Sequence, residues 1–229
     1  MLYTNLSPSD SPLVPSPMYK PETLVCHTNS SVSASPPEAL NKQSAPATSP
    51  VVLLKEMFAR NEFGNRLLAN QRNNIGFARP SKEAIEAYDL TVVQAIRDND
   101  LGRLRAMLRE GKSFDACNRF GESLIHMVCR RGNIEMANFL IQEARVDVDV
   151  RDDFGRTPIH DACWTSKPNI AMMDLLINNV PPDMLLTEDV RGHTPFDYAR
   201  KEHYDEWTQY LRSKEEDIQL RITTFGMIW

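Results

Sequence analysis

The sequence lacks the features that mark several large classes of proteins. Its nine glycines are scattered singly, so it contains no glycine-rich loop that would cradle a phosphate group. No apolar run approaches the roughly 18 residues of a membrane-spanning helix, and prolines interrupt the apolar residues near the start, which predicts no cleaved signal peptide. We therefore expect neither a membrane partner nor a nucleotide cofactor.

Cysteine is also scarce. The four cysteines, Cys26, Cys117, Cys129 and Cys163, form no C-x-x-C pair, and only one of them lies in the first quarter of the chain. This pattern does not suggest a disulfide framework, and reduced thiols inside the cell are the simpler interpretation. We expect a location in the cytoplasm, the nucleus or both.

A basic excess is missing as well. The net charge is -5, and residues 89–211 hold 15 Lys and Arg against 21 Asp and Glu. A domain that binds nucleic acid usually carries the opposite balance. The charge therefore predicts no nucleic-acid partner.

The first part of the chain has the composition of a disordered tail. Residues 1–50 contain ten Ser and nine Pro and few large apolar side chains, so they cannot offset the entropy cost of ordering. The Ser-Pro pairs are either sites for proline-directed kinases or a product of linker composition. They begin at Ser7, Ser11, Ser16, Ser35 and Ser49.

Residues 51–88 change in character. Val51, Leu54 and Phe58 recur at near-helical spacing, which predicts a helical segment. This helical linker either docks on a partner or packs on the following domain as an N-terminal cover, because repeat arrays need their exposed ends closed.

A pattern repeats through residues 89–211. Gly121, Gly155 and Gly192 stand 34 and 37 residues apart, each within a turn-forming stretch. Behind each glycine comes a Ser or Thr, which favours a helix N-cap, and in two units a Pro suited to the first helical turn. A second amphipathic stretch then follows in each unit, so every unit is predicted to hold two helices.

The stretch T-P-I-H-D-A-C at residues 157–163 resembles the signature T-P-L-H-x-A-A of ankyrin repeats, whose period of about 33 residues also agrees. The resemblance implies an all-α solenoid of helix-turn-helix repeats with β-hairpin or loop tips, preceded by the long disordered tail. The expected units are about 89–117, 118–151, 152–187 and 188–211, followed by a C-terminal tail at 212–229.

Ankyrin-type arrays generally bind proteins through their hairpin tips and the concave face of their first helices. The resemblance implies a non-catalytic adaptor or scaffold with a protein partner, no cofactor and no small-molecule substrate. The alternative is a regulatory or inhibitory subunit that masks an enzyme or a transcription factor. The positions carried over as partner-binding residues are Arg119, Phe120, Arg130, Arg131, Arg151, Asp153, Phe154, Arg156, Trp164, Val190, Arg191 and Lys201.

Two aromatic tips stand out in that set. Phe120 and Phe154 share one position in successive repeats, and Val190 is taken as their counterpart in the last unit. They are either exposed anchors for a partner or side chains tucked between neighbouring hairpins. The arginines around them suit a partner that bears carboxylate groups beside apolar side chains.

The sequence also offers a possible metal or nucleophile site. His126 with Cys129, and His160 with Cys163, place H-x-x-C twice on equivalent helices. Packed helices lie about 10 Å apart, whereas zinc needs four ligands at about 2.0–2.3 Å from one ion. A nucleophile would also need an orienting group and an oxyanion pocket. We therefore predict neither metal ligands nor catalytic residues.

Overall fold

The structure is a computed structural model that describes residues 48–70 and 80–228, all of which belong to the unit Ser44–Trp229. Most of the predicted tail, residues 1–50, lies outside the described residues, and so do the Ser-Pro pairs that begin before residue 48.

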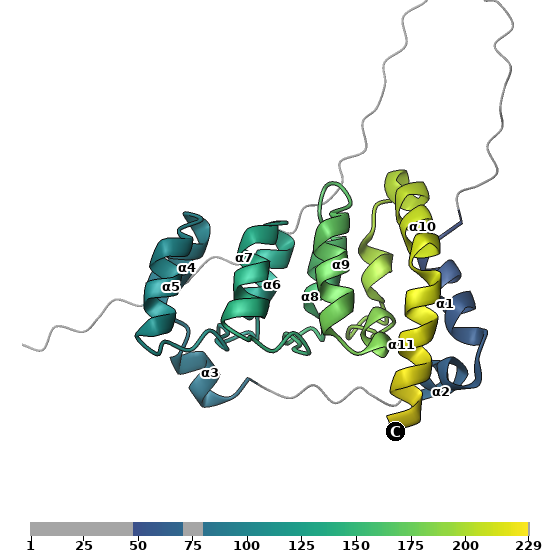
Figure 1. Cartoon of the computed structure of the whole chain (residues 1–229), viewed down its shortest axis with the longest axis horizontal. Helices are drawn as coiled ribbons and strands as arrows, with labels where there is room; N and C mark the ends of the chain where they lie inside the picture. Colours follow the sequence, from purple (N-terminus) through teal and green to yellow (C-terminus); the bar gives the residue numbers. More distant parts are fainter. Residues whose placement is uncertain (1–47, 71–79, 229) are drawn as a thin grey trace, which may run out of the picture. The chain divides into compact units, whose positions relative to one another are not determined.

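The repeat region is a row of helix pairs, which Figure 1 shows side by side from α4 to α10. The bounds of its elements are α4 Leu90–Arg97, α5 Leu101–Arg109, α6 Leu124–Arg130, α7 Ile134–Asn138, the π-helical η2 Phe139–Glu143, α8 Pro158–Cys163, α9 Ile170–Asn179, the 3-10 helices η3 Pro182–Leu185, η4 Pro195–Tyr198 and η5 Lys201–His203, and α10 Tyr204–Ser213. The described part of the chain contains no β-strand, only an isolated antiparallel bridge between Cys117 and Ser123. The predicted all-α architecture is confirmed.

Side-chain caps start the second helix of the first three pairs, α5, α7 and α9. The Oδ1 of Asn133 accepts a hydrogen bond of 3.1 Å from the amide of Met136, and the Oδ1 of Asn169 accepts one of 3.0 Å from Met172. The turn before α9, residues 164–169, is longer than the turn before α7, residues 131–133. Asn169 ends the longer turn, and its side chain donates to the carbonyl of Gly132 in the preceding unit at 2.9 Å. Asn169 therefore caps α9 as Asn133 caps α7, although the turn before it is longer.

The repeated histidines join one unit to the next. The Nδ1 of His126 lies 2.8 Å from the hydroxyl of Ser123, and its Nε2 lies 2.9 Å from the carbonyl oxygen of Arg156 in the following unit. His160 repeats this arrangement with Thr157 and with the carbonyl of His193. Because the carbonyl can only accept, the Nε2 must carry the proton in each ring. Each histidine thus ties the start of a helix to the next hairpin.

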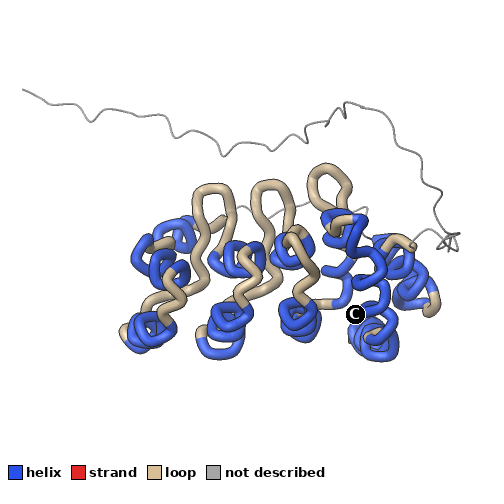
Figure 2. The backbone as a smooth tube through the Cα atoms, turned by 90° about the horizontal axis from the view of Figure 1, so that it is seen from above, coloured by secondary structure: helices blue, strands red, loops and turns tan. Residues whose placement is uncertain are grey.

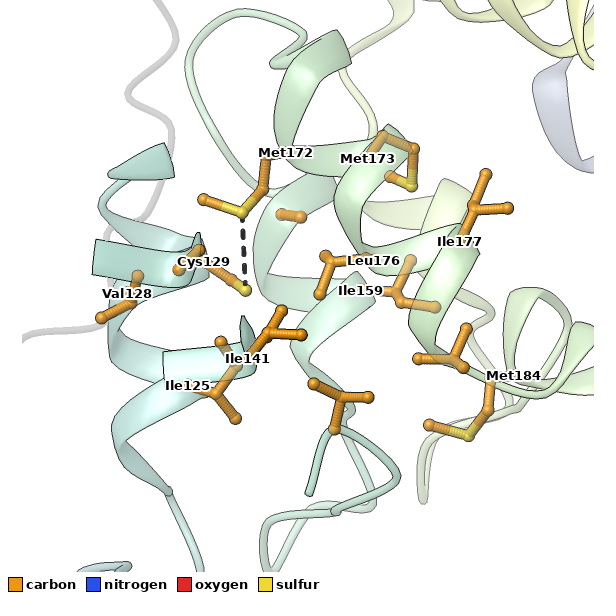
Figure 3. Packing of buried hydrophobic residues seen from close by; sticks show 14 of the residues in the cluster. Ile125, Val128, Cys129, Ile141, Ile159, Met172, Met173, Leu176, Ile177 and Met184 are labelled. Carbon is orange, nitrogen blue, oxygen red and sulfur yellow. Dashed lines mark hydrogen bonds between the residues drawn. The ribbon is translucent and has the colours of Figure 1, made fainter. Parts of the chain in front are cut away.

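The core runs between the two rows of helices. α6 packs on α8 and α8 on η4, while α7 packs on α9. Figure 3 shows the middle of this core, where the fully buried Cys129 lies against Met172 with a sulfur–sulfur distance of 3.9 Å. A cysteine at this position keeps the neighbouring helices close because its side chain is small.

The start and the end of the described chain together close the C-terminal end of the row. α1 (Pro50–Ala59) packs on α10, η4 and α11 (Glu215–Ile228), and α2 (Glu62–Asn70) packs on α11. Figure 1 shows α1 and α2 beside α11 at this end of the row. We call α1, α2 and α11 the end cap. The end cap buries Leu54, Met57 and Phe58 completely.

The end cap differs from the expectation in two respects. The helix at the start of residues 51–88 covers the C-terminal end of the array and not the N-terminal one. Residues 212–229, expected as a tail, hold the end of α10 and all of α11, with Ile218 and Ile222 buried. The physical reason is the last unit, whose large apolar side chains Phe196 and Trp207 need a cover. At the opposite end lies the short helix α3 (Lys82–Glu86), where the carbonyl of Ala84 accepts a bond of 3.1 Å from the amide of Cys117.

Candidate protein-interaction surface

The loops between successive helix pairs project to one side of the helices, as Figure 2 shows. In each tip the side chain of an Asn or Asp accepts hydrogen bonds from two backbone amides of the same tip. The Oδ1 of Asp152 accepts bonds of 2.9 Å from the amides of both Phe154 and Arg156, and Asn118 and Asp189 do the same in their own tips. A glycine with positive φ follows in each tip, as at Gly121, where φ is 74°. The tips are therefore rigid before any partner arrives.

Neighbouring tips are linked through their backbones. The amide of Asp153 donates to the carbonyl of Phe120, and the amide of Val190 donates to the carbonyl of Phe154, both at 2.9 Å. This register corrects one expectation. Val190 occupies the position of Asp153, and the counterpart of the two phenylalanines is Arg191. Counting back from the tip glycine gives the right residue in each unit.

The two aromatic tips are open to solvent. Phe120 is 51% exposed and Phe154 is 54% exposed, so neither side chain is tucked between hairpins. The guanidinium of Arg119 lies 4.7 Å from the centre of the Phe120 ring, and that of Arg156 lies 5.2 Å from the Phe154 ring. Val190, also half exposed, extends this apolar line.

Several of the predicted arginines already have acidic partners inside the domain. Arg156 donates to the Oδ2 of Asp152 from two nitrogens, at 2.8 and 2.5 Å. Arg130 pairs with Glu122 and lies 3.5 Å from Asp161. Arg191 lies 3.5 Å from Asp189 and donates to the hydroxyl of Tyr198. These three side chains brace the tips, which reduces the free positive charge.

The remaining predicted positions divide by exposure. Arg131, Asp153 and Lys201 are exposed, whereas Arg151 is partly buried. The structure pairs none of Arg119, Arg131 and Lys201 with a carboxylate of the described residues. These three cations are therefore the ones available to a partner.

A second aromatic group lies beside the tips. Trp164, which follows the last residue of α8, is 55% exposed, and its ring centre lies 5.4 Å from that of Tyr198. The Tyr198 hydroxyl donates to Asp189 at 2.5 Å, and burial together with this bond raises the pKa of Tyr198 to about 12. We define the tip face as Phe120, Phe154, Val190, Trp164 and Tyr198 with the cations Arg119, Arg131 and Lys201.

Tyr198 and Asp161 were missed in the sequence analysis. They occupy the same position in successive repeats, since Asp161 follows His160 and Tyr198 follows Asp197. Asp161 lies near Arg130, and the ring of Tyr198 lies against that of Trp164. Burial raises the pKa of Asp161 to about 6, although Arg130 and Arg156 oppose the shift. Aligning the repeats on their tip glycines places both residues at the same position, and this alignment could have indicated them from the sequence.

The buried cysteines offer no reactive thiol. Cys117, Cys129 and Cys163 are all free and buried, and burial raises the thiol pKa of Cys129 and Cys163 well above the ordinary value. A thiol with a raised pKa is a poor nucleophile and a poor metal ligand. Within residues 48–70 and 80–228, no three His, Cys, Asp or Glu side chains gather closely enough to hold a metal ion. None of the described helices has the length and apolar content of a membrane span.

Comparison with known proteins supports the repeat assignment. Residues 92–184 match the family model of ankyrin repeats, which describes three copies. Mouse protein phosphatase 1 regulatory subunit 27 is 32% identical over 84 residues, which are 36% of this chain and 54% of that protein. The human SMC5-SMC6 complex localization factor protein 1 is 31% identical over 83 residues, or 36% of this chain and 8% of that protein.

The similarity to an enzyme is more distant. The putative glutaminase 2 of Caenorhabditis elegans is 27% identical over 114 residues, which cover 49% of this chain and 19% of that protein. The chain spans about half of the regulatory subunit's length and a small fraction of the other two.

Proposed function

We propose that this chain, whose residues 92–184 match the family model of ankyrin repeats, binds a protein partner through the tip face and catalyses no reaction itself. Residues 89–211 are the binding domain in this proposal. The end cap stabilises it, since α1 and α11 bury the apolar end of the last unit.

The observation that carries the proposal is the exposure of Phe120 and Phe154 on tips held rigid by backbone and side-chain bonds. Exposed aromatic residues in a row are costly to leave in water, and aromatic side chains are frequent anchors of interfaces. Rigid tips lose little conformational freedom on binding, so more of the contact energy remains as affinity.

The charges on the tip face indicate the chemistry of the partner. Arg119, Arg131 and Lys201 are exposed and have no carboxylate partner among the described residues, and Arg119 lies against the Phe120 ring. A partner with carboxylates beside apolar side chains would satisfy both features. The free buried thiols favour a reducing compartment, so we place this binding in the cytoplasm or the nucleus.

A regulatory role is the second candidate. It is favoured by the similarity to a protein named as a phosphatase regulatory subunit, which is 32% identical over 84 residues. In that case the tip face would cover the active surface of an enzyme, and binding would lower the partner's activity.

The test uses the full chain as bait in lysate of its own cells, followed by binding assays with each purified captured protein. The double variant Phe120→Ala/Phe154→Ala should keep the melting temperature of the parent and weaken binding at least tenfold, since each anchor typically contributes about 2 kcal/mol. The matched control, Val52→Ala/Leu220→Ala, removes two exposed apolar side chains from the end cap and should bind like the parent. Equal affinity of all three proteins would contradict the proposal. An activity assay on the captured partner separates the adaptor from the regulatory subunit.

A further inference from the structure

A cavity of about 530 Å³ lies between α3 and the segments that lead into the second and third repeat tips. One wall is the start of α3, with Pro80, Ser81 and Ala84. The segment 115–117 forms another wall, and the amide of Cys117 donates a hydrogen bond to the carbonyl of Ala84 that joins the two walls. The volume falls within the range of about 300–1,000 Å³ that is common for ligand sites.

The lining of the cavity combines buried apolar side chains with three exposed carboxylates and one partly buried cation. Ala116 and Val146 are buried and contribute the floor. Asp115, Asp147 and Asp149 also line the cavity, but they are exposed. With Arg151 as the single cation, the charged side chains of the lining carry an excess of negative charge.

Backbone contacts hold two of these carboxylates in place. The Oδ1 of Asp115 accepts a bond of 2.9 Å from the amide of Asp147, and the Oδ1 of Asp147 accepts one of 2.9 Å from the amide of Asp149. In each case only one carboxylate oxygen is used by these bonds. Among the described residues, none of the three aspartates forms an ion pair within hydrogen-bonding range. Burial and the nearby carboxylate of Asp147 raise the pKa of Asp149, with Arg151 opposing.

We propose that this cavity binds an arginine side chain carried by an extended segment of a partner protein. The three-carbon stem of arginine would pack on Ala116 and Val146, and its planar guanidinium would reach the carboxylates of Asp115 and Asp147. Arginine suits two fixed carboxylates better than lysine, because it presents several donors in one plane.

This inference does not depend on the proposed function of the tip face. The cavity is lined by none of the residues that define the tip face. The double variant Phe120→Ala/Phe154→Ala should therefore still bind an arginine probe. Loss of the tip contacts and loss of the cavity contacts can be told apart in this way.

The test is a titration of the full ¹⁵N-labelled chain with the peptide acetyl-Gly-Leu-Arg-Leu-Gly-amide, followed by NMR. Saturable shifts should gather at the amides around Ala84, Ala116 and Val150. Asp147→Asn should weaken the binding about tenfold, since a hydrogen bond to a charged group is lost. Glu110→Gln, which removes the same charge from an exposed site outside the cavity, should have no effect.

A second pair of variants tests the cavity itself. Ala84→Leu should fill the cavity and abolish the shifts, whereas Ala171→Leu adds the same bulk at an exposed helical site and should leave them unchanged. Equal binding by Ala84→Leu, or equal binding of the peptide with Gln in place of Arg, would overturn the proposal. So would shifts at these amides that appear on concentrating the protein alone, because they would assign the cavity to a second copy of the chain.

Discussion

The side-chain amide of Asn61 donates a hydrogen bond of 2.7 Å to the Oε1 of Gln219, although 158 residues separate the two in sequence. The Nε2 of Gln219 donates in turn to the carbonyl of Met57, and Arg60 pairs with Glu215. These contacts join α1 and the start of α2 to α11. The stability of the last repeat therefore depends on residues that precede the first one.

The end cap provides the first prediction. Leu54→Ala should lower the free energy of unfolding by about 2–5 kcal/mol, because Leu54 is completely buried in α1. Val52→Ala on the same helix should change it by less than about 0.5 kcal/mol, because Val52 is 49% exposed. Denaturant unfolding of the full chain measures both. Similar small losses for the two variants would mean that α1 does not pack on the array in solution.

The repeat was predictable from the sequence, whereas the end cap was not. Helix starts such as Pro158 follow from capping and turn chemistry, which are local. The spacing of Val51, Leu54 and Phe58 predicts a helix with an apolar face, but spacing says nothing about the surface that this face meets. α11 had a signal that was overlooked, since Ile218 and Ile222 are four residues apart on one helical face.

Thr157 provides the second prediction. Its hydroxyl lies 2.9 Å from the Nδ1 of His160, and this bond fixes the ring that reaches the next hairpin. Thr157→Ala should lower the free energy of unfolding by about 1 kcal/mol. Thr224→Ala, at an exposed hydroxyl that bonds only to its own helix, is the control. A melting curve identical to that of the parent would show that the Thr157 hydroxyl contributes nothing to folding.

The buried histidine makes stability depend on pH. Burial lowers the pKa of His160 from its ordinary value of 6.5 to about 4. Between these two values the unfolded chain binds a proton at this ring and the folded chain does not, so the free energy of unfolding falls as the pH falls, by on the order of 3 kcal/mol in total. Above pH 6.5 the ring is neutral in both the folded and the unfolded chain, so His160 no longer makes the free energy of unfolding depend on pH.

Asp161 acts in the opposite direction, so the measurement must isolate His160. The raised pKa of Asp161, about 6, means that the folded chain takes up this proton first, which adds stability as the pH falls. Comparing the parent with His160→Gln at each pH removes the contribution of Asp161. The stability difference between the two proteins should shrink from neutral pH towards pH 4. A difference that stays constant over this range would contradict a neutral buried ring.

The tip face was only partly predictable. The exposure of Phe120 and Phe154 follows from their place in the turn, which is a local property. The pairing of Arg156 with Asp152 within one tip was not foreseen, because residues of opposite charge four apart meet only when the turn folds back. Charge counted along the sequence therefore overstated the free positive charge of the surface.

Trp164 and Lys201 provide the last prediction, which concerns the kinetics of partner binding. Trp164 is a half-exposed aromatic side chain that lies against Tyr198. We expect its contacts with the partner to form only after the two proteins have docked. Trp164→Ala should therefore raise the dissociation rate at least tenfold and leave the association rate nearly unchanged. Lys201 is exposed and has no carboxylate partner among the described residues, so Lys201→Ala should mainly lower the association rate and its dependence on salt. Surface plasmon resonance at two salt concentrations separates the two effects. If Trp164→Ala changed only the association rate, the tryptophan would not be a docked anchor, and the partner would bind elsewhere on the tip face.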